Sequence, residues 1–376
     1  MVEVAVVHHS LNPCGGGERV CVHTLLTLNE MGIVPTLVTF EPTDWSRVEK
    51  LIGVVPERVR EVHVSRGAVR FLGLYSKLGL VYRVWRLRRR FDAVVNTHGD
   101  VVLVPYADVI YMHYPHITYT GGELYRYFMR KYERSVLWKL YSVPYRVATH
   151  LIKERSVGGL IITNSRWSRG VIEEFTGKRA VVIHPPVPIE KFIELRRFSR
   201  ERLVISITRF TWEKRPWVIP HIARLCPDIE FVLIGSLGGF RSRETFERVL
   251  RLRERFSVRN LKVLVDVPEG VKLSYLARAR AYLHTMISEH FGIAPLEAMA
   301  SGCVVIAHAS GGLFTDVLDY GRYGLVYRRY SEVPELIYRA VDEYPKHVAP
   351  TEHVLKFTAS TFRKKMRRIF EKVLST

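Results

Sequence analysis

The chain has 376 residues, of which 47% are hydrophobic and 25% are charged, and its formal net charge is +20. This length is too great for one compact domain and suits two, and the composition is typical of a folded protein rather than a disordered one. The large positive charge indicates an anionic partner, such as a phosphorylated ligand, nucleic acid or an acidic membrane surface.

Other compositional features limit the setting. The N-terminus opens on a strand-like run, so we expect no signal peptide, and no run approaches the roughly 18 apolar residues of a membrane span. The absence of glutamine together with abundant arginine is typical of a thermophile. The cysteines lack C-x-x-C spacing, which predicts a reduced cytoplasmic protein without a disulfide framework or zinc site. They are Cys14, Cys21, Cys226 and Cys303.

Short apolar runs alternate with helical patterns in the first half of the chain. A Gly-rich turn and a helix over Glu18–Met31 follow the first run. Buried runs that alternate with helices indicate a parallel sheet covered on both faces. The strands predicted here are Glu3–His8, Pro35–Phe40, Ala93–Thr97, Val109–His113, Leu160–Thr163 and Ala180–His184.

The segment Pro185–Pro188 interrupts this pattern as a linker, and a second alternating series follows. We therefore expect two Rossmann-like domains, at residues 1–186 and 187–355, and a C-terminal helix over 356–376 that could pack back on the first domain. The strands predicted in the second series are Arg202–Thr208, Glu230–Ile234, Leu261–Val265, Ala281–Thr285 and Val304–Ala307.

Ligands of such sheets bind at the carboxyl ends of the strands, so two facing sheets would create a cleft. Gly16 and Gly17 follow the first strand and open the first helix, where glycine lets an anion approach backbone N–H groups, although a plain tight turn would look the same. Arg209 and Lys214 follow the first strand of the second series. Two cations there can neutralise a diphosphate, the alternative being a solvated basic loop.

The segment from Glu289 to Glu297 places two carboxylates eight positions apart, around a turn that contains Gly292 and ahead of an apolar-periodic helix. Such a pair can bind two hydroxyl-rich parts of one ligand, a sugar ring and a ribose. An ordinary loop-to-helix junction with two surface glutamates is the alternative. His113 ends an apolar strand. Its ring either points into the cleft or has a structural role.

Two basic segments contain interleaved aromatic residues. Arg66–Arg90 has eight lysines and arginines and no acid, and Leu124–Arg155 is similar. A basic amphipathic helix of this kind can lie on an anionic membrane surface, but it can also be a core-facing helix or a nucleic-acid patch. No Asp-x-Asp occurs, so we expect no metal and expect cationic side chains to carry the diphosphate charge.

Four segments together resemble the retaining GT-B glycosyltransferases of family 4, over nearly the whole chain. Within that family the resemblance favours the mannosyltransferases of lipid-linked oligosaccharides, although the chain lacks their N-terminal span and a long insertion within Asp228–Val258. The segments are Gly15–Val20, Tyr111–Pro115, Asn164–Ser168 and the string from His284 to Gly302.

The resemblance implies a role for each candidate residue. Arg209 and Lys214 hold the donor diphosphate, Glu297 binds the ribose, and Glu289 with the backbone of Phe291, Gly292 and Ile293 holds the transferred sugar. Gly16 and Gly17 supply N–H donors, and His113 lines the reaction centre.

The leading hypothesis is a retaining hexosyltransferase without a cofactor, peripheral on the inner face of the membrane, that moves mannose from GDP-mannose to a lipid-linked or other glycan acceptor. A transferase with a soluble acceptor is one alternative. Another is a non-catalytic binder of anionic surfaces or nucleic acid on a GT-B scaffold, although no nucleic-acid motif supports it.

Overall fold

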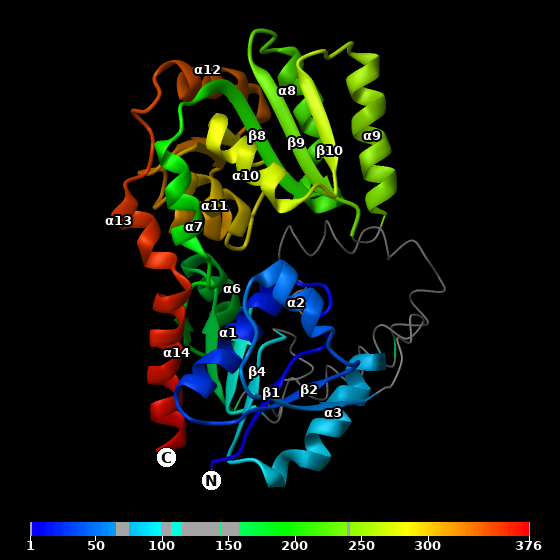
Figure 1. Ribbon diagram of the computed structural model, residues 1–376, viewed down its shortest axis with the longest axis vertical. Helices are drawn as coiled ribbons and strands as arrows, with labels where there is room; N and C mark the ends of the chain where they lie inside the picture. The colour runs from blue at the N-terminus through cyan, green and yellow to red at the C-terminus, as the bar shows by residue number, and fades with distance from the viewer. Residues whose placement is uncertain are drawn as a thin grey trace. The chain divides into compact units, whose positions relative to one another are not determined.

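The computed structural model describes residues 2–64, 75–98, 107–114, 143, 158–238 and 241–375. The chain divides into two compact units, whose elements are labelled in Figure 1. Unit 1 comprises Met1–Pro186 together with Ala359–Thr376, and unit 2 comprises Val187–Thr358. The chain therefore passes between the units twice, and at the second crossing it returns to unit 1.

Unit 1 is built on a seven-stranded sheet in the order β3-β2-β1-β4-β5-β6-β7, with every neighbouring pair parallel. Its central strands are short runs rich in β-branched residues, which suit a pleated surface covered on both faces. The strands are β1 Val4–Val7, β2 Thr36–Thr39, β3 Arg60–His63, β4 Ala93–Asn96, β5 Val109–Met112, β6 Leu160–Thr163 and β7 Ala180–Val182.

Helices cover both faces of this sheet. On one face lie α1 (Gly16–Glu30), α2 (Trp45–Ile52) and α14 (Ala359–Leu374), and on the other lie α3 (Tyr75–Leu87) and α6 (Arg166–Thr176). The C-terminal α14 runs beside α1, as Figure 1 shows. It buries a stripe with i, i+4, i+8 spacing, which is the apolar face of an amphipathic helix: Phe362, Met366 and Phe370.

Unit 2 repeats this plan with a six-stranded parallel sheet in the order β10-β9-β8-β11-β12-β13. Its first strand, β8, is central and nine residues long. The strands are β8 Glu201–Arg209, β9 Glu230–Ser236, β10 Leu261–Val265, β11 Ala279–Leu283, β12 Val304–His308 and β13 Leu325–Tyr327.

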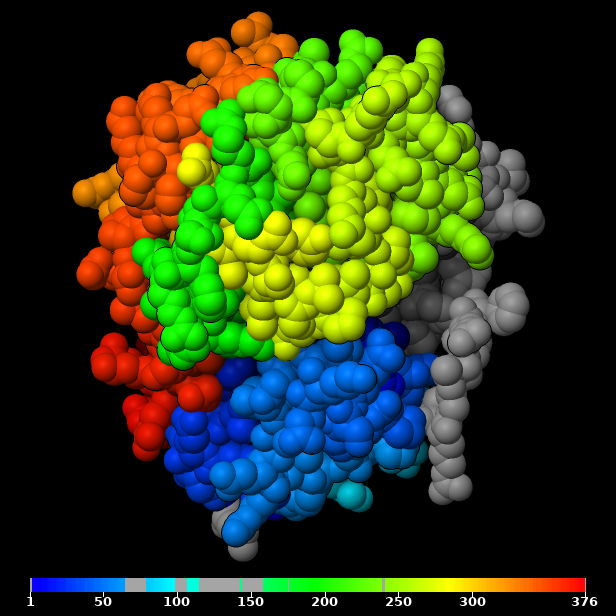
Figure 2. Space-filling model, turned by 45° about the horizontal axis from the view of Figure 1, so that its top comes forward, coloured from blue at the N-terminus to red at the C-terminus, as the bar shows by residue number. Residues whose placement is uncertain are grey.

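The helices of unit 2 also form two layers. One core cluster joins the sheet to α7 (Ile189–Ile193), α10 (Glu269–Arg278), α11 (Ile293–Ser301) and α13 (Thr351–Val354). The other joins it to α8 (Ile219–Arg224), α9 (Ser242–Arg255) and α12 (Val333–Asp342). Figure 2 shows the green segment around α7 against the yellow segment around α10, where Lys191 and Glu269 form an ion pair at 2.8 Å.

The predicted α/β class with two Rossmann-like sheets is confirmed, since the first six strands of unit 1 are arranged in the same order as the six strands of unit 2. Two edge strands, β3 and β13, were absent from the prediction: residues of β3 are exposed or half-buried, and β13 has only three residues. The predicted linker contains Val187, whose N–H donates to the Phe357 carbonyl at 3.2 Å. Unit 2 extends to Thr358, and α14 belongs to unit 1.

Candidate active site

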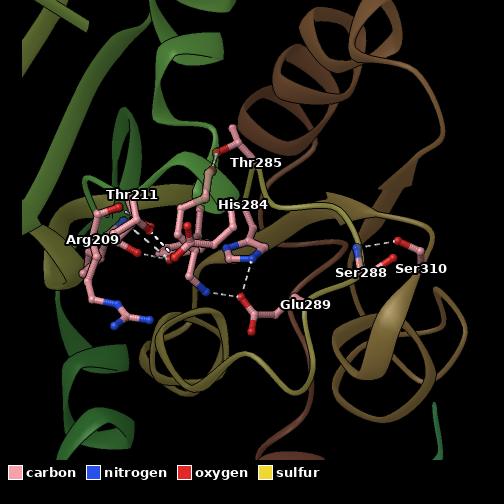
Figure 3. Close-up of polar contacts among 12 residues, drawn as sticks. Arg209, Thr211, His284, Thr285, Ser288, Glu289 and Ser310 are labelled. Carbon is pink, nitrogen blue, oxygen red and sulfur yellow. Dashed lines mark hydrogen bonds and ion pairs between the residues drawn. The ribbon is translucent and has the colours of Figure 1, made fainter. Parts of the chain in front are cut away.

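Three loops at the carboxyl ends of β8, β11 and β12 bring polar side chains together in unit 2 (Figure 3). Since all strands of the sheet are parallel, these ends meet at one edge. The first loop supplies Lys214, the second supplies His284 and Glu289, and the third supplies Ser310.

The centre of this arrangement is the Glu289 carboxylate. Its Oε2 atom accepts from Lys214 Nζ at 2.5 Å and contacts His284 Nε2 at 3.0 Å. Glu289 is 9% exposed and His284 is 5% exposed. A buried carboxylate of this kind is stable only when charge-assisted hydrogen bonds replace water, and here two side chains do so.

The pKa values of the buried pair move in definite directions. Burial by itself raises the pKa of Glu289, but Lys214 and His284 outweigh burial and hold it well below its ordinary value. Burial lowers the pKa of His284, although Glu289 opposes the change. At neutral pH Glu289 is therefore ionised and His284 is neutral.

Main-chain contacts fix the three loops. Thr285 Oγ1 donates to the Lys214 carbonyl at 2.6 Å, and Ser288 N donates to Ser310 Oγ at 2.9 Å. Glu289 pairs with Gly311 as an isolated parallel bridge. Gly311 has φ 78°, and a Cβ atom there would lie 2.3 Å from the Glu289 carbonyl oxygen, so only glycine allows this approach.

Gly292 and Glu297 belong to the next turn of the chain. Gly292, with φ 93°, precedes α11, which begins at Ile293, while Phe291 is buried. Glu297 is 6% exposed and accepts from Lys272 Nζ of α10 at 3.1 Å. The two glutamates of the predicted pair are therefore each bound to a different lysine, so neither is an ordinary surface glutamate.

Arg209 is the exposed last residue of β8. Figure 3 shows it at the opposite end of the constellation from Ser288 and Ser310. Both predicted cations lie near the end of β8, as expected. Arg209 is on the strand, and Lys214 is on the 3-10 turn Trp212–Lys214 that follows it. Lys214 already has a carboxylate partner, which the sequence did not indicate.

The candidates of unit 1 form a separate group. Gly16 and Gly17 open α1, and Gly15 N donates to Glu18 Oε2 at 2.7 Å. A Cβ atom on Gly17 would lie 3.3 Å from His113 Nε2 and 3.8 Å from the His8 ring. The structure therefore places Gly17 and His113 side by side at the carboxyl edge of this sheet.

His8, at the end of the first predicted strand, also belongs to this group, although a structural role is what its position indicated. Its Nδ1 lies 3.0 Å from Thr97 Oγ1 and its Nε2 lies 3.6 Å from Glu18. Burial opposes its charge, but Cys21 and Glu18 together raise the pKa of His8 to about 10. His8 thus lies close to the glycine turn and to the Glu18 carboxylate that caps it.

Two features of the described residues bear on metal and membrane binding. In these ranges no group of three or more His, Cys, Asp or Glu side chains is arranged to hold a metal ion. The helices of the described part include none long and apolar enough to cross a bilayer. Of the two predicted basic segments, residues 75–90 of the first are described, whereas the second lies outside the described residues except for Val143.

Comparisons with known proteins indicate the class of enzyme. Residues 189–347, nearly all of unit 2, match the family described as glycosyl transferases group 1. The GDP-Man:Man(3)GlcNAc(2)-PP-Dol alpha-1,2-mannosyltransferase of Xenopus laevis is 27% identical over 84% of this chain and 74% of that protein. The human enzyme of the same name is 28% identical over 43% of this chain, a match that spans 36% of the human protein.

Among solved structures, HepE of Anabaena in complex with UDP and glucose has a TM-score of 0.69 at 16% identity, and the match covers 99% of this chain and 100% of HepE. At that identity the likeness shows the fold, which is GT-B. The family match in unit 2 and the mannosyltransferase relatives add the activity, so the protein is a glycosyltransferase with the GT-B fold. Within that class, the match to the group 1 glycosyltransferases lies in unit 2, over residues 189–347.

Proposed function

We propose that the protein transfers mannose from GDP-mannose to a lipid-linked glycan, with retention of the anomeric configuration. The names of the Xenopus and human relatives support the donor and the acceptor. The observation that carries the proposal is the Lys214–Glu289 pair, a cation and a carboxylate held 2.5 Å apart at the carboxyl edge of the sheet. Such a pair suits a sugar diphosphate, which has a negative group beside hydroxyls.

Each candidate residue has a proposed role in this reaction. Arg209 and Lys214 stabilise the departing diphosphate, which is where negative charge develops. Glu289 accepts hydrogen bonds from the transferred sugar, and Glu297 accepts them from the ribose. Gly16 and Gly17 donate N–H groups to phosphate and His113 lines the reaction centre. The leaving phosphate takes the proton of the acceptor hydroxyl, so no protein base is required.

The lipid-linked acceptor is proposed to lie at the inner face of the membrane, where basic residues hold the enzyme. Exposed residues near the C-terminal end of α3 support this, because aromatic and cationic side chains lie together there: Tyr82, Trp85, Arg86, Arg89 and Arg90. Because HepE was solved with UDP and glucose, UDP-glucose is the second donor to test.

The test is transfer from a panel of nucleotide sugars to a polyprenyl-diphosphate oligosaccharide, with the product linkage determined by NMR. GDP-mannose should be the best donor and the new linkage should be α. We expect activity to survive EDTA, because the proposed diphosphate site uses Arg209 and Lys214. Preference for UDP-glucose would reassign the donor, a β-linked product would exclude retention, and loss on chelation restored by Mg²⁺ would reveal a metal site.

A further inference from the structure

Glu289 uses one oxygen for both of its side-chain partners. Lys214 Nζ and His284 Nε2 both contact Oε2. A carboxylate only accepts hydrogen bonds, so a neutral His284 must carry its hydrogen on Nε2 to donate. The other oxygen, Oε1, is then the one left to accept from a ligand.

His284 is held rigidly by its surroundings. It directly follows β11, and its N–H continues the sheet by donating to the Ile306 carbonyl at 2.9 Å. Its own carbonyl accepts from the Tyr327 hydroxyl at 2.9 Å. Its ring lies nearly parallel to that of Tyr282, at 17° and with 6.5 Å between centroids. At 5% exposure, His284 is placed to hold Glu289 and not to contact substrate itself.

Lys214 is fixed differently. Its carbonyl is held by Thr285, but its side chain is 17% exposed and ends a short 3-10 turn. A lysine side chain has several rotatable bonds, so its ammonium can turn from Glu289 toward a phosphate while its backbone stays in place. When it does so, His284 becomes the partner that keeps Glu289 in position.

We infer that His284 is a positioning residue: it donates its Nε2 hydrogen to Glu289 Oε2, so that Oε1 faces the hydroxyls of the transferred sugar while Lys214 serves the diphosphate. This role rests on the proposed function. The titratable and charged groups around it are Glu289, Lys214, His290, which acts electrostatically on Glu289, and the stacked Tyr282.

A matched pair of substitutions isolates the hydrogen bond. His284→Gln places an amide N–H near the position of Nε2, whereas His284→Asn ends one carbon short and cannot reach Oε2. The two variants share polarity, and only the reach of the amide differs. His353→Asn is the control for loss of a buried histidine, because His353 is 4% exposed and its Nε2 bonds to the Val317 carbonyl at 2.7 Å, not to Glu289.

The readouts separate positioning from general damage. Loss of a hydrogen bond to a charged group should lower kcat of His284→Asn by about 10-fold or more, with His284→Gln close to wild type. Since His284 helps keep the pKa of Glu289 low, the acid limb of kcat/KM should move to higher pH in the Asn variant alone. GDP affinity should not change, because Arg209 and Lys214 hold the diphosphate. His353→Asn should lower thermal stability without moving the limb.

Equal kinetics of the Gln and Asn variants, or an unmoved acid limb in His284→Asn, would overturn the inference while leaving the proposed function in place. If no nucleotide sugar is turned over, the proposed function fails, and a carboxyl carbon-13 NMR titration of Glu289 decides the inference separately. The pKa of Glu289 should then be higher in His284→Asn than in His284→Gln, and identical values would refute the hydrogen bond.

Discussion

Lys214 has to serve two anions, the Glu289 carboxylate that it contacts at 2.5 Å and the diphosphate of the proposed donor. Its removal therefore has two effects. It takes away a proposed ligand of the phosphate, and it leaves the buried Glu289 carboxylate with His284 as its side-chain partner on Oε2. The pKa of Glu289 should rise as a result, because Lys214 is the largest of the influences that lower it.

We predict that Lys214→Ala and Arg209→Ala each lower turnover by about 10²-fold or more, with the fold retained. Loss of a charge-assisted bond to a phosphate in a closed site costs ~2–4 kcal/mol of transition-state stabilisation. Steady-state kinetics with the best donor measures the effect, and the exposed Lys356→Ala is the control, expected to match wild type. Wild-type kinetics in both site variants would contradict the assignment of the donor site.

At this scale the sequence could indicate residues but not their partners. Arg209, Lys214, Glu289 and Glu297 follow from strand ends and spacing. The His284 and Lys272 contacts do not, because they depend on ring orientation and on how α10 packs against α11. His284 could have been predicted as a site residue, because it is a histidine at a strand end. No local signal in the sequence pairs Lys272 with Glu297.

The attachment of α14 to α1 depends on a histidine that must stay neutral. Arg363 Nη1 donates to His23 Nδ1 at 3.2 Å, and Arg363 also pairs with Glu30 at 2.8 Å. Burial, followed by the charges of Arg363 and Arg19, lowers the pKa of His23 to about 3. The folded protein therefore keeps His23 unprotonated through a pH range in which the unfolded chain binds a proton.

We predict that unit 1 loses stability as pH falls from about 6.5 toward 3, by up to ~1.4 kcal/mol per pH unit from this group. The sign follows because the unfolded state binds more protons in that interval. His23→Asn places a non-titrating acceptor near Nδ1 and should flatten this part of the profile. Urea unfolding at several pH values measures it, and an equal pH dependence in both proteins would contradict the role of His23.

The end of β9 depends on a glycine without a positive φ angle. A Cβ atom on Gly235 would lie 2.3 Å from the ring of Phe210, which is fully buried and packs edge-on against Phe246 at 5.0 Å. The ring therefore cannot turn away cheaply. Phe210 directly follows Arg209, so the same packing sets the loop that leads to Lys214.

We predict that Gly235→Ala lowers the stability of unit 2 by ~1–3 kcal/mol, the usual cost of overpacking a filled core. Gly238→Ala is the control, since a Cβ there meets nothing within 4 Å. Thermal unfolding followed by circular dichroism compares the two. Equal melting temperatures would show that Phe210 yields to the added methyl group.

Elements were predicted well where burial dictates the sequence and poorly where it does not. The central strands are runs of buried apolar residues, such as Val4–Val7 and Leu160–Thr163. The edge strand β3 reads Arg-Glu-Val-His, which carries no apolar run, because an edge is partly solvated. The sequence predicted a C-terminal helix over 356–376 that could pack on the first domain, but not that α1 is the helix beside it.

At the scale of the whole molecule, the excess positive charge can bind a membrane only through basic side chains that are exposed. The predicted membrane segment ends in α3 and the turn Arg88–Arg90. Arg88 is unavailable to a membrane, because its Nη2 donates to both carboxylate oxygens of Asp108, at 2.9 and 3.0 Å. Arg86, Arg89 and Arg90 are exposed, and Tyr82 and Trp85 beside them are 58% and 54% exposed.

We predict that the protein co-sediments with anionic liposomes at low salt and much less with neutral ones. Each cation near an anionic surface contributes ~1 kcal/mol, and salt weakens this attraction because screening shortens to about 3 Å at 1 M. Replacing Arg86, Arg89 and Arg90 with serine should release the protein at lower salt. The same replacement at Arg243, Arg251 and Arg255 of α9 is the matched control and should have a smaller effect.

Arg88→Ser should instead lower the stability of the fold, because it removes the contacts of Arg88 with Asp108. Equal binding to neutral and anionic vesicles, or none to either, would refute membrane attachment and favour a soluble acceptor.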